Sequence, residues 1–440
     1  MVPVVNYPSA EAEGFLCAVT GRQVAVDVEL EKRVRDIVEA VRHDGDEALV
    51  DFTRRFDAPN FTKAQIRVHA EEIEEAYENV EPALVDVIRK ARDNIRRFHE
   101  HQRPSSWFMT RSDGCYMGQM VRPVSAAGLY VPGGQGGETP LVSTVLMTAV
   151  PAVVAGVSDI AMVTPPRRDG TLNPYLLVAA QEAGVHRIHK VGSAWAVAAL
   201  AYGTESVPPV DVVVGPGNIY VTLAKKMVSG RVGIDSFAGP SEVVVIADRT
   251  ADAHVVAADL LSQAEHDPMA SAVCLTDDAQ LANKVLGALE SQTKELPRQE
   301  IAREALSRYG AIILTKSLEE AVDVANRLAP EHLELLVEDP WALLPRVHNA
   351  GAVFMGTHTP EALGDYFAGP NHVLPTSGTA RFASALGVET FVKKTTVLAY
   401  SREAFVRDAP AVAALAGLER LDAHARSVHV RMGKSNRSAP

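Results

Sequence analysis

Two polar side chains near the end of a predicted helix have the types and spacing of a metal-binding pair. Gln263 and His266 are three positions apart, so a helix carries them on one face, about one turn from each other. An amide oxygen and an imidazole nitrogen at this spacing can bind one metal ion. A single histidine at a helix end is more often a surface residue that interacts with the helix dipole, so a metal site requires further ligands.

Two other regions offer these ligands. The loop 364–376 supplies Asp365 and His372, and the C-terminal region supplies Glu419 and His424. Nitrogen and oxygen ligands are normal for zinc. We therefore predict a zinc site that combines the first pair with Asp365 and one further histidine. The spacing leaves both histidines open as the fourth ligand.

An acid and a histidine are adjacent in Pro330-Glu331-His332. Neighbouring side chains diverge on a regular strand or helix, so both reach one ligand only where the backbone is irregular, and Pro330 supplies such a break. A carboxylate and an imidazole in one pocket are what proton abstraction and water activation require. The alternative is a surface pair without a catalytic role.

Two glycine-rich connections follow predicted strands. Residues 128–138 can expose backbone N–H groups to a phosphate or a cofactor, although a tight loop without a ligand explains them equally well. They lack the GxGxxG spacing of the usual dinucleotide-binding fingerprint. In 214–220, Asn218 follows the carboxyl end of a strand, which is where open α/β sheets bind ligands.

Alternating strands and helices predict the framework that positions these groups. The predicted strands are 127–131, 159–163, 186–191 and 210–214, then 243–246, 271–275, 311–314 and 352–354. The intervening helices indicate right-handed βαβ units and parallel sheets. We predict an α/β fold with two open, mostly parallel, Rossmann-like domains and small N-terminal and C-terminal accessory domains.

The expected division of the chain has four parts. They are an N-terminal arm (1–25), a discontinuous α/β domain with most zinc and catalytic residues (26–127 and 242–386), a second α/β domain with cofactor-contacting loops (128–241) and a C-terminal helical block (387–440). Within them, helices are expected at 29–42, 46–56 and 82–101, a short strand at 427–431 and a disordered tail at 433–440.

Length and composition exclude several classes of protein. A chain of 440 residues exceeds the roughly 250–300 residues at which one core stops growing, which predicts several domains. A net charge of −12 argues against nucleic-acid binding. No secretory signal is visible, and the most apolar stretch, 142–163, is interrupted by Pro151, which argues against a membrane span. Three cysteines cannot form a disulfide framework, so a cytoplasmic protein is expected.

Seven segments resemble those of the histidinol dehydrogenase family and occur in the family's order. They are GLYVPGG, VGPGNIYV, GIDSFAGPSEVVVIAD, LLSQAEHD, APEHLEL, GDYFAGPNHVLPT and LERLDAH. The similarity runs from about residue 27 to residue 431. It implies a homodimeric enzyme of histidine biosynthesis, which oxidises L-histidinol to L-histidine through bound L-histidinal, with two NAD, water and one zinc ion per subunit.

The resemblance also implies roles for individual residues. His332 resembles the general base, and Glu331 the residue that activates water. The implied zinc ligands are Gln263, His266, Asp365 and His424, the last from the partner subunit. The implied substrate contacts are Ser241, Gln263, His266, His332, Asp365, Glu419 and His424. Tyr130 and Asn218 match family contacts to NAD.

The chain departs from the family pattern at one cofactor position. Gly-Gly-Ala-Gln-Ala is here Gly192-Ser193-Ala194-Trp195-Ala196, so Trp195 replaces a glutamine assigned to NAD. Its ring either stacks on the cofactor or fills the pocket wall. The loop 133–138 also differs from the commoner version.

Three other functions agree with parts of the sequence. They are a related dehydrogenase for another small polar alcohol, a zinc hydrolase in which Glu331 activates water without NAD, and a non-catalytic protein with structural zinc. Structural zinc favours cysteine, and no candidate ligand is a cysteine. A covalent route through Cys115 is disfavoured because no histidine lies beside it in the sequence.

Overall fold

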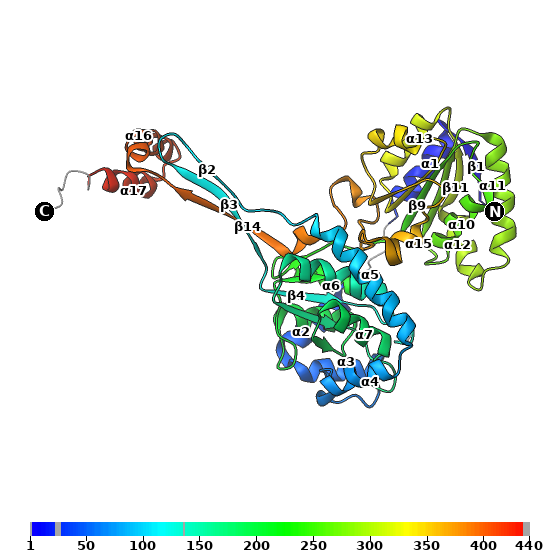
Figure 1. Ribbon diagram of the computed structural model, residues 1–440, viewed down its shortest axis with the longest axis horizontal. Helices are drawn as coiled ribbons and strands as arrows, with labels where there is room; N and C mark the ends of the chain where they lie inside the picture. Colours follow the sequence, from blue (N-terminus) through cyan, green and yellow to red (C-terminus); the bar gives the residue numbers. More distant parts are fainter. Residues whose placement is uncertain (1, 23–27, 135–136, 434–440) are drawn as a thin grey trace. The chain divides into compact units, whose positions relative to one another are not determined.

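The computed structural model describes residues 2–22, 28–134 and 137–433 (Figure 1). The chain forms two compact units. Residues up to 103 and residues 124–391 make the first, and residues 104–123 with those from 392 onward make the second.

The first unit contains a parallel sheet of six strands. Its strands, in spatial order, are β1 (Val4–Asn6), β11 (Gly310–Leu314), β10 (Ser271–Thr276), β9 (Glu242–Ala247), β12 (His332–Leu336) and β13 (Ala352–Met355). Helices α10 (Ala253–Ala264), α11 (Ala279–Thr293) and α12 (Gln299–Tyr309) cover one face, and α1 (Ala10–Thr20), α13 (Leu318–Leu328) and α14 (Pro340–Leu343) cover the other. Because both faces are buried, the central strands are continuous apolar runs.

A second parallel sheet in this unit has five strands. They are β6 (Arg187–His189), β5 (Asp159–Val163), β4 (Ala126–Tyr130), β7 (Val212–Val214) and β8 (Gly233–Ile234). The connecting helices are α6 (Val142–Ala155), α7 (Pro174–Ala183), α8 (Ser193–Tyr202) and α9 (Ile219–Val228). Two parallel sheets with interleaved helices confirm the predicted α/β class.

A layer of four N-terminal helices lies beside the five-stranded sheet. The helices are α2 (Val28–Asp44), α3 (Asp46–Phe56), α4 (Ala70–Glu78) and α5 (Pro82–Glu100). Val34, Val38 and Leu49 share one core with Trp195 and other residues of α8, and α4 and α5 contact α7. The layer therefore packs on the five-stranded sheet, whereas the expected division grouped it with residues 242–386. Short 3₁₀ turns lie at Lys63–Gln65, Leu344–Arg346, Thr379–Arg381 and Val388–Phe391.

Residues 4–20, which the sequence predicted to be an arm, are part of the six-stranded sheet. Val4 to Asn6 pair in parallel with Ile312 to Leu314, and Leu16 of α1 is buried against the sheet. A three-residue edge strand whose partner is about 300 positions away leaves no periodic signal in its own sequence.

The second unit is a three-stranded antiparallel sheet with two helices. It contains β2 (Trp107–Thr110), β3 (Tyr116–Pro123), β14 (Val392–Ala399), α16 (Arg402–Leu418) and α17 (Asp422–Gly433). The predicted strand at 427–431 is wrong, since these residues belong to α17. Their alternation of apolar and polar residues is too short to distinguish a strand from an exposed helix. The tail 434–440 lies outside the described residues.

No helix in the described part of the chain has the length and hydropathy needed to cross a bilayer.

Candidate active site

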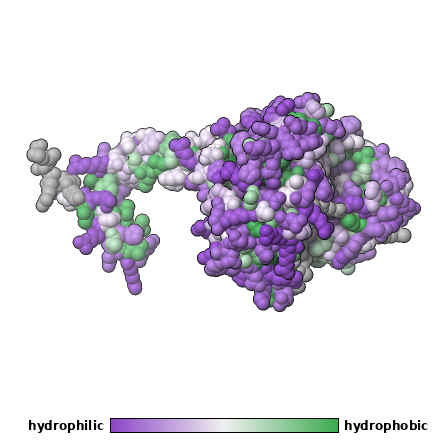
Figure 2. Space-filling view, turned by 90° about the horizontal axis from the view of Figure 1, so that it is seen from below, coloured by the Kyte–Doolittle hydropathy of each residue, from purple (hydrophilic) through white to green (hydrophobic). Residues whose placement is uncertain are grey.

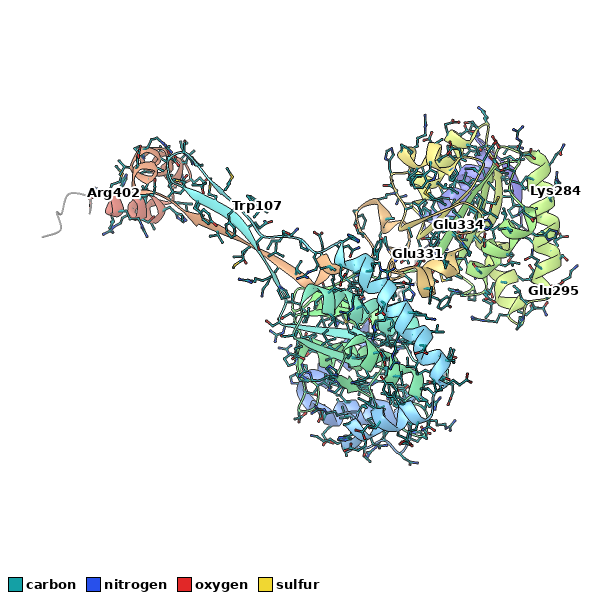
Figure 3. The ribbon with its side chains drawn as sticks, in the orientation of Figure 1. Trp107, Lys284, Glu295, Glu331, Glu334 and Arg402 are labelled. Atoms are coloured by element: carbon teal, nitrogen blue, oxygen red, sulfur yellow. The ribbon has the colours of Figure 1, made fainter. Side chains whose placement is uncertain are left out.

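The predicted acid–base pair lies at the amino end of β12. Helix α13 ends at Leu328; its C-cap, Ala329, has a left-handed φ of 50°, and Pro330 follows. Glu331 comes directly before the strand and His332 begins it, and both side chains are buried (Figure 3 labels Glu331). The irregular backbone that the pair requires is therefore this connection between α13 and β12.

The imidazole of His332 is held in one tautomer by its partners. Nδ1 lies 3.0 Å from Oε1 of Gln263 and 3.3 Å from the carbonyl oxygen of Glu242. Since both partners are acceptors, Nδ1 carries the proton and Nε2 carries a lone pair. Nε2 is buried without a hydrogen-bond partner among the described residues, 4.0 Å from Oδ1 of Asp365. Burial lowers the pKa of His332 to about 3, so the free ring is neutral.

Two carboxyl groups face this imidazole from one short segment. Helix α15 (Glu361–Leu363) continues into a π-helical turn, Gly364–Ala368, which carries Asp365. Oε1 of Glu361 lies 3.6 Å from Nδ1 of His332, and ligand atoms of His332, Glu361 and Asp365 all lie within 4.8 Å of one another. These three residues can hold a metal ion.

Both carboxyl groups are perturbed by burial. Burial raises the pKa of Asp365 to about 6. Burial, and then the charges of Asp365 and Asp259, raise the pKa of Glu361 to about 8. Sequence reasoning missed Glu361, although its position four residues before Asp365 in a helical segment was a usable signal.

Glu334 is a buried carboxyl group that contacts the backbone of this cluster. It is two positions after His332 on β12 (labelled in Figure 3) and is 1% exposed. Its Oε1 accepts a hydrogen bond from the Glu361 N–H. Burial, followed by the nearby Asp259 carboxyl, raises the pKa of Glu334, which also hydrogen-bonds to Asp259. A proton shared between these two carboxyl groups avoids two buried negative charges in contact.

Glu331 lies in a buried environment with several acidic neighbours, Glu242, Glu361 and Asp365. Burial raises its pKa well above the ordinary value, the charge of Glu242 adds to the shift, and a hydrogen bond with the Ser241 side chain opposes it. Its Oε2 is buried without a hydrogen-bond partner among the described residues. A carboxyl group in this setting retains an acceptor for a water molecule or a substrate.

Of the four residues predicted to bind zinc, the first unit brings Gln263 and Asp365 to His332. His266 follows the end of α10, and desolvation lowers its pKa. The amide oxygen of Gln263 has a second lone pair beside its bond to His332, so it can still bind a cation. Amide, imidazole and carboxylate donors together suit zinc.

The remaining predicted residues of the substrate site belong to the second unit. Glu419 directly follows α16 as its C-cap, and His424 lies in the first turn of α17. Both are exposed. The alternative ligand His372 lies in the first unit, where its Nδ1 is 3.0 Å from the Asp365 carbonyl oxygen and burial lowers its pKa to about 4. His372 and Asp365 line a cavity of about 120 Å³.

The predicted cofactor residues lie at carboxyl ends of the five-stranded sheet. Tyr130 ends β4, and its hydroxyl accepts a hydrogen bond from the Ser193 N–H over 3.2 Å. Asn218 caps α9 through Oδ1, which accepts hydrogen bonds from the N–H groups of Tyr220 and Val221. Residues 135 and 136 of the glycine-rich loop lie outside the described residues.

Trp195 is part of the protein core. Its ring stacks on Phe52 at 5.7 Å and on Phe56 at 5.6 Å between centroids, and it is 4% exposed. Two roles were considered for this ring, stacking on the cofactor and filling the wall of the cofactor pocket. Its packing against Phe52 and Phe56 favours the second role.

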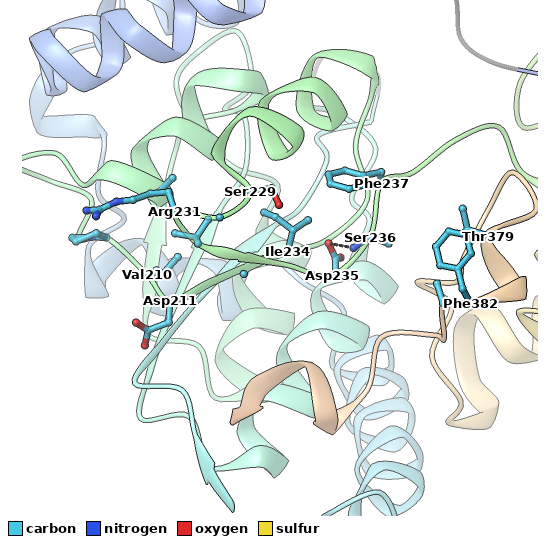
Figure 4. A pocket seen from close by; sticks show the side chains of 16 residues that line it. Val210, Asp211, Ser229, Arg231, Ile234, Asp235, Ser236, Phe237, Thr379 and Phe382 are labelled. Carbon is cyan, nitrogen blue, oxygen red and sulfur yellow. Dashed lines mark hydrogen bonds between the residues drawn. The ribbon is translucent and has the colours of Figure 1, made fainter. Parts of the chain in front are cut away.

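A cavity of about 860 Å³ lies beside β8 (Figure 4). Its lining includes Val210, Asp211, Asp235 and Phe237, and none of the predicted site residues. It therefore adds no group to the cluster around His332.

Comparisons with known proteins cover most of the chain. A family model described as "Histidinol dehydrogenase" matches residues 21–432. The histidinol dehydrogenase of Desulfotalea psychrophila is 53% identical over 424 residues, which are 96% of this chain and 98% of that protein. That of Oleidesulfovibrio alaskensis is 56% identical over 403 residues, 92% of this chain and 93% of that protein.

A solved structure shares the fold of the chain. The crystal structure of histidinol dehydrogenase from Elizabethkingia anophelis superposes with a TM-score of 0.92 at 36% sequence identity, and the match covers 99% of each chain. The similarity therefore extends through both compact units.

Proposed function

Because this chain belongs to the histidinol dehydrogenase family, we propose that it oxidises L-histidinol to L-histidine in two steps, with L-histidinal held between them. The overall reaction consumes two NAD and one water and forms two NADH. The observation that carries this proposal is the buried pair at the start of β12, a neutral imidazole with a free Nε2 and a carboxyl group with a free Oε2.

In the first step, His332 accepts the proton of the substrate alcohol on Nε2 as hydride leaves the carbon. A ring with so low a pKa is a weak base on its own, so the imidazolium requires a stabilising anion. Asp365, whose Oδ1 lies 4.0 Å from Nε2, supplies this negative charge. The bonds of Nδ1 to Gln263 and to the Glu242 carbonyl keep the ring oriented throughout.

In the second step, Glu331 removes a proton from water as the water attacks the aldehyde. The resulting gem-diol then loses a second hydride. A carboxyl group whose pKa is raised is a stronger base than an ordinary glutamate once it is ionised, which favours water activation. Ser241 orients this carboxyl group through its hydroxyl.

Zinc and NAD fit the groups that the chain provides. Gln263, His266 and Asp365 would hold zinc together with the partner's His424, and zinc would orient the imidazole and amine of the substrate. Tyr130 and Asn218 would contact NAD, which accepts the hydrides.

Three cysteines without disulfides suit a reducing compartment, and we place the enzyme in the cytoplasm.

The test is the amount of NADH formed per L-histidinol consumed, before and after chelation and after zinc is returned. We expect two NADH per substrate, loss of activity on chelation and recovery with zinc. One NADH with free aldehyde would contradict the role of Glu331. No NADH from L-histidinol would favour another small alcohol as the substrate, and hydrolysis without NAD would favour the hydrolase.

We also propose a homodimer in which the second unit of one subunit completes the site of the other. Apolar side chains of this unit support an interface, since Leu398 is 62%, Leu415 63% and Leu418 81% exposed in the single chain. Figure 2 shows hydrophobic surface, in green, on this unit. The predicted substrate contacts Glu419 and His424 lie in the same unit.

Mixing two inactive variants tests the shared site. We expect His332→Asn and His424→Asn to be nearly inactive alone, and the refolded mixture to recover about one quarter of the wild-type activity. Half of the dimers in the mixture are hybrids, and each hybrid has one intact site. A site built within one chain predicts no recovery, because every chain then has one damaged residue in its own site.

A further inference from the structure

Arg22 is a buried arginine, and each of its three guanidinium nitrogens donates a hydrogen bond. It follows the end of α1 and is 6% exposed. Nη2 donates to Oε1 of Glu242 at 2.7 Å, Nη1 to the Met269 carbonyl at 2.5 Å and Nε to the Val19 carbonyl at 3.1 Å. The guanidinium also lies 5.3 Å from the ring centroid of Tyr309. These contacts place one cation beside the carboxylate of Glu242.

The other oxygen of Glu242 holds two backbone groups of the active-site region. Oε2 accepts hydrogen bonds from the N–H groups of Glu331 and Ser377, each at 3.2 Å. Ser377 has a φ of 54°, and the chain enters Glu331 from Ala329 at 50°, so both segments have backbone conformations that require outside support. Glu242 therefore links Arg22 to the peptide that carries the water-activating carboxyl group.

The contact between Glu242 and the Glu331 segment depends on the positive charge of Arg22. Glu242 and Glu331 are both buried, and an ionised Glu242 without a cation would repel a carboxylate on Glu331. Loss of the Arg22 charge should affect His332 less than Glu331. The hydrogen-bond partners of His332 are the amide of Gln263 and the backbone carbonyl of Glu242, and the pairing of β9 with β12 holds that carbonyl in place.

We propose that Arg22 is a positioning residue for the aldehyde step, which acts through Glu242 to fix the backbone and the charge environment of Glu331. This inference rests on the proposed function. It predicts that the two half-reactions respond unequally to loss of Arg22, because only the second requires Glu331.

The experiment measures single-turnover NADH formation by the full-length enzyme from L-histidinol and, separately, from added L-histidinal. For Arg22→Met we expect oxidation of L-histidinal to slow about 10-fold or more, and the alcohol step to change by about 3-fold or less. Arg22→Lys keeps the charge but loses part of the contact set, so we expect it to fall between Arg22→Met and the wild type.

Arg308→Met is the matched control. Arg308 also lies on the Tyr309 ring, at 5.5 Å, but it is exposed and pairs with Glu304 instead of Glu242. We expect both half-reactions of this variant to match the wild type.

Equal slowing of both half-reactions by Arg22→Met, or no slowing of either, would overturn the proposal. If Arg22→Met does not fold, Arg22→Lys and Glu242→Gln provide the same comparison of half-reactions. Failure of the proposed function is recognised separately, because the wild type would then form no NADH from either compound.

Discussion

Replacing His332 by asparagine is expected to lower the rate of NADH formation from L-histidinol by about 10²–10⁴-fold, the usual contribution of a general base. Asparagine can keep a hydrogen bond to Gln263 but has no lone pair that accepts a proton at neutral pH. The loss should appear in the first turnover, because the alcohol must lose its proton before any aldehyde exists. The measurement is single-turnover absorbance of NADH.

Two controls separate this loss from damage to the fold or to the metal site. His348→Asn removes an exposed imidazole from the same region of the chain and should leave the rate unchanged. Zinc content should stay near that of the wild type, since His332 is not among the proposed zinc ligands. A rate for His332→Asn within a few-fold of the wild type would exclude His332 as the base. Loss of zinc from this variant would instead favour a direct ligand role, as the cluster with Glu361 and Asp365 allows.

The framework was predictable because its signals are local. The ranges predicted at 46–56 and 159–163 coincide with α3 and β5, and the apolar runs of β9 and β10 identify strands buried on both faces. In contrast, β12 was missed although it lies between β9 and β13. Its sequence, HLELL, places a histidine and a glutamate among the apolar residues, and periodicity alone does not distinguish a strand that carries catalytic groups from a loop.

The edge of the six-stranded sheet at which the site lies was not predicted. The rule for open α/β sheets favours carboxyl ends of strands, and Tyr130 and Asn218 follow it on the other sheet. Ser241 and Glu331, however, precede β9 and β12, so they lie at amino ends. Helix α10 runs antiparallel to the strands, and its carboxyl end brings Gln263 to the same edge.

The parts that sequence reasoning could not reach depend on long-range contacts. Arg22 and Glu242 are 220 positions apart, and neither residue alone indicates a buried ion pair. The role of Trp195 was open to two interpretations because its packing depends on Phe52 and Phe56, which belong to a helix far away in the sequence. Glu419 as a substrate contact and His424 as a zinc ligand and substrate contact remain predictions, since both roles require a second subunit.

Replacing Glu331 by glutamine is expected to stop the reaction at the aldehyde. The amide has nearly the same shape and can keep a hydrogen bond to Ser241, but it cannot take a proton from water. The ratio of NADH formed to L-histidinol consumed should fall from two towards one. Oxidation of added L-histidinal should slow by about 10²–10⁴-fold, whereas the first step should persist. An aldehyde-trapping reagent in the assay would capture the L-histidinal that leaves the enzyme.

The pH dependence of the aldehyde step gives an independent test of the same role. Glu331 acts as a base only after it has lost its proton, and burial raises its pKa well above the ordinary value. The wild-type rate should therefore fall as the pH decreases through this raised pKa, and the Glu331→Gln variant should lose that dependence. Glu338→Gln, which changes an exposed carboxyl group shortly after β12, should keep both the stoichiometry and the pH profile of the wild type. A Glu331→Gln enzyme that still forms two NADH would mean that another group activates the water, and the buried carboxyl of Glu361 would be the next candidate, because it lies 3.6 Å from the His332 ring.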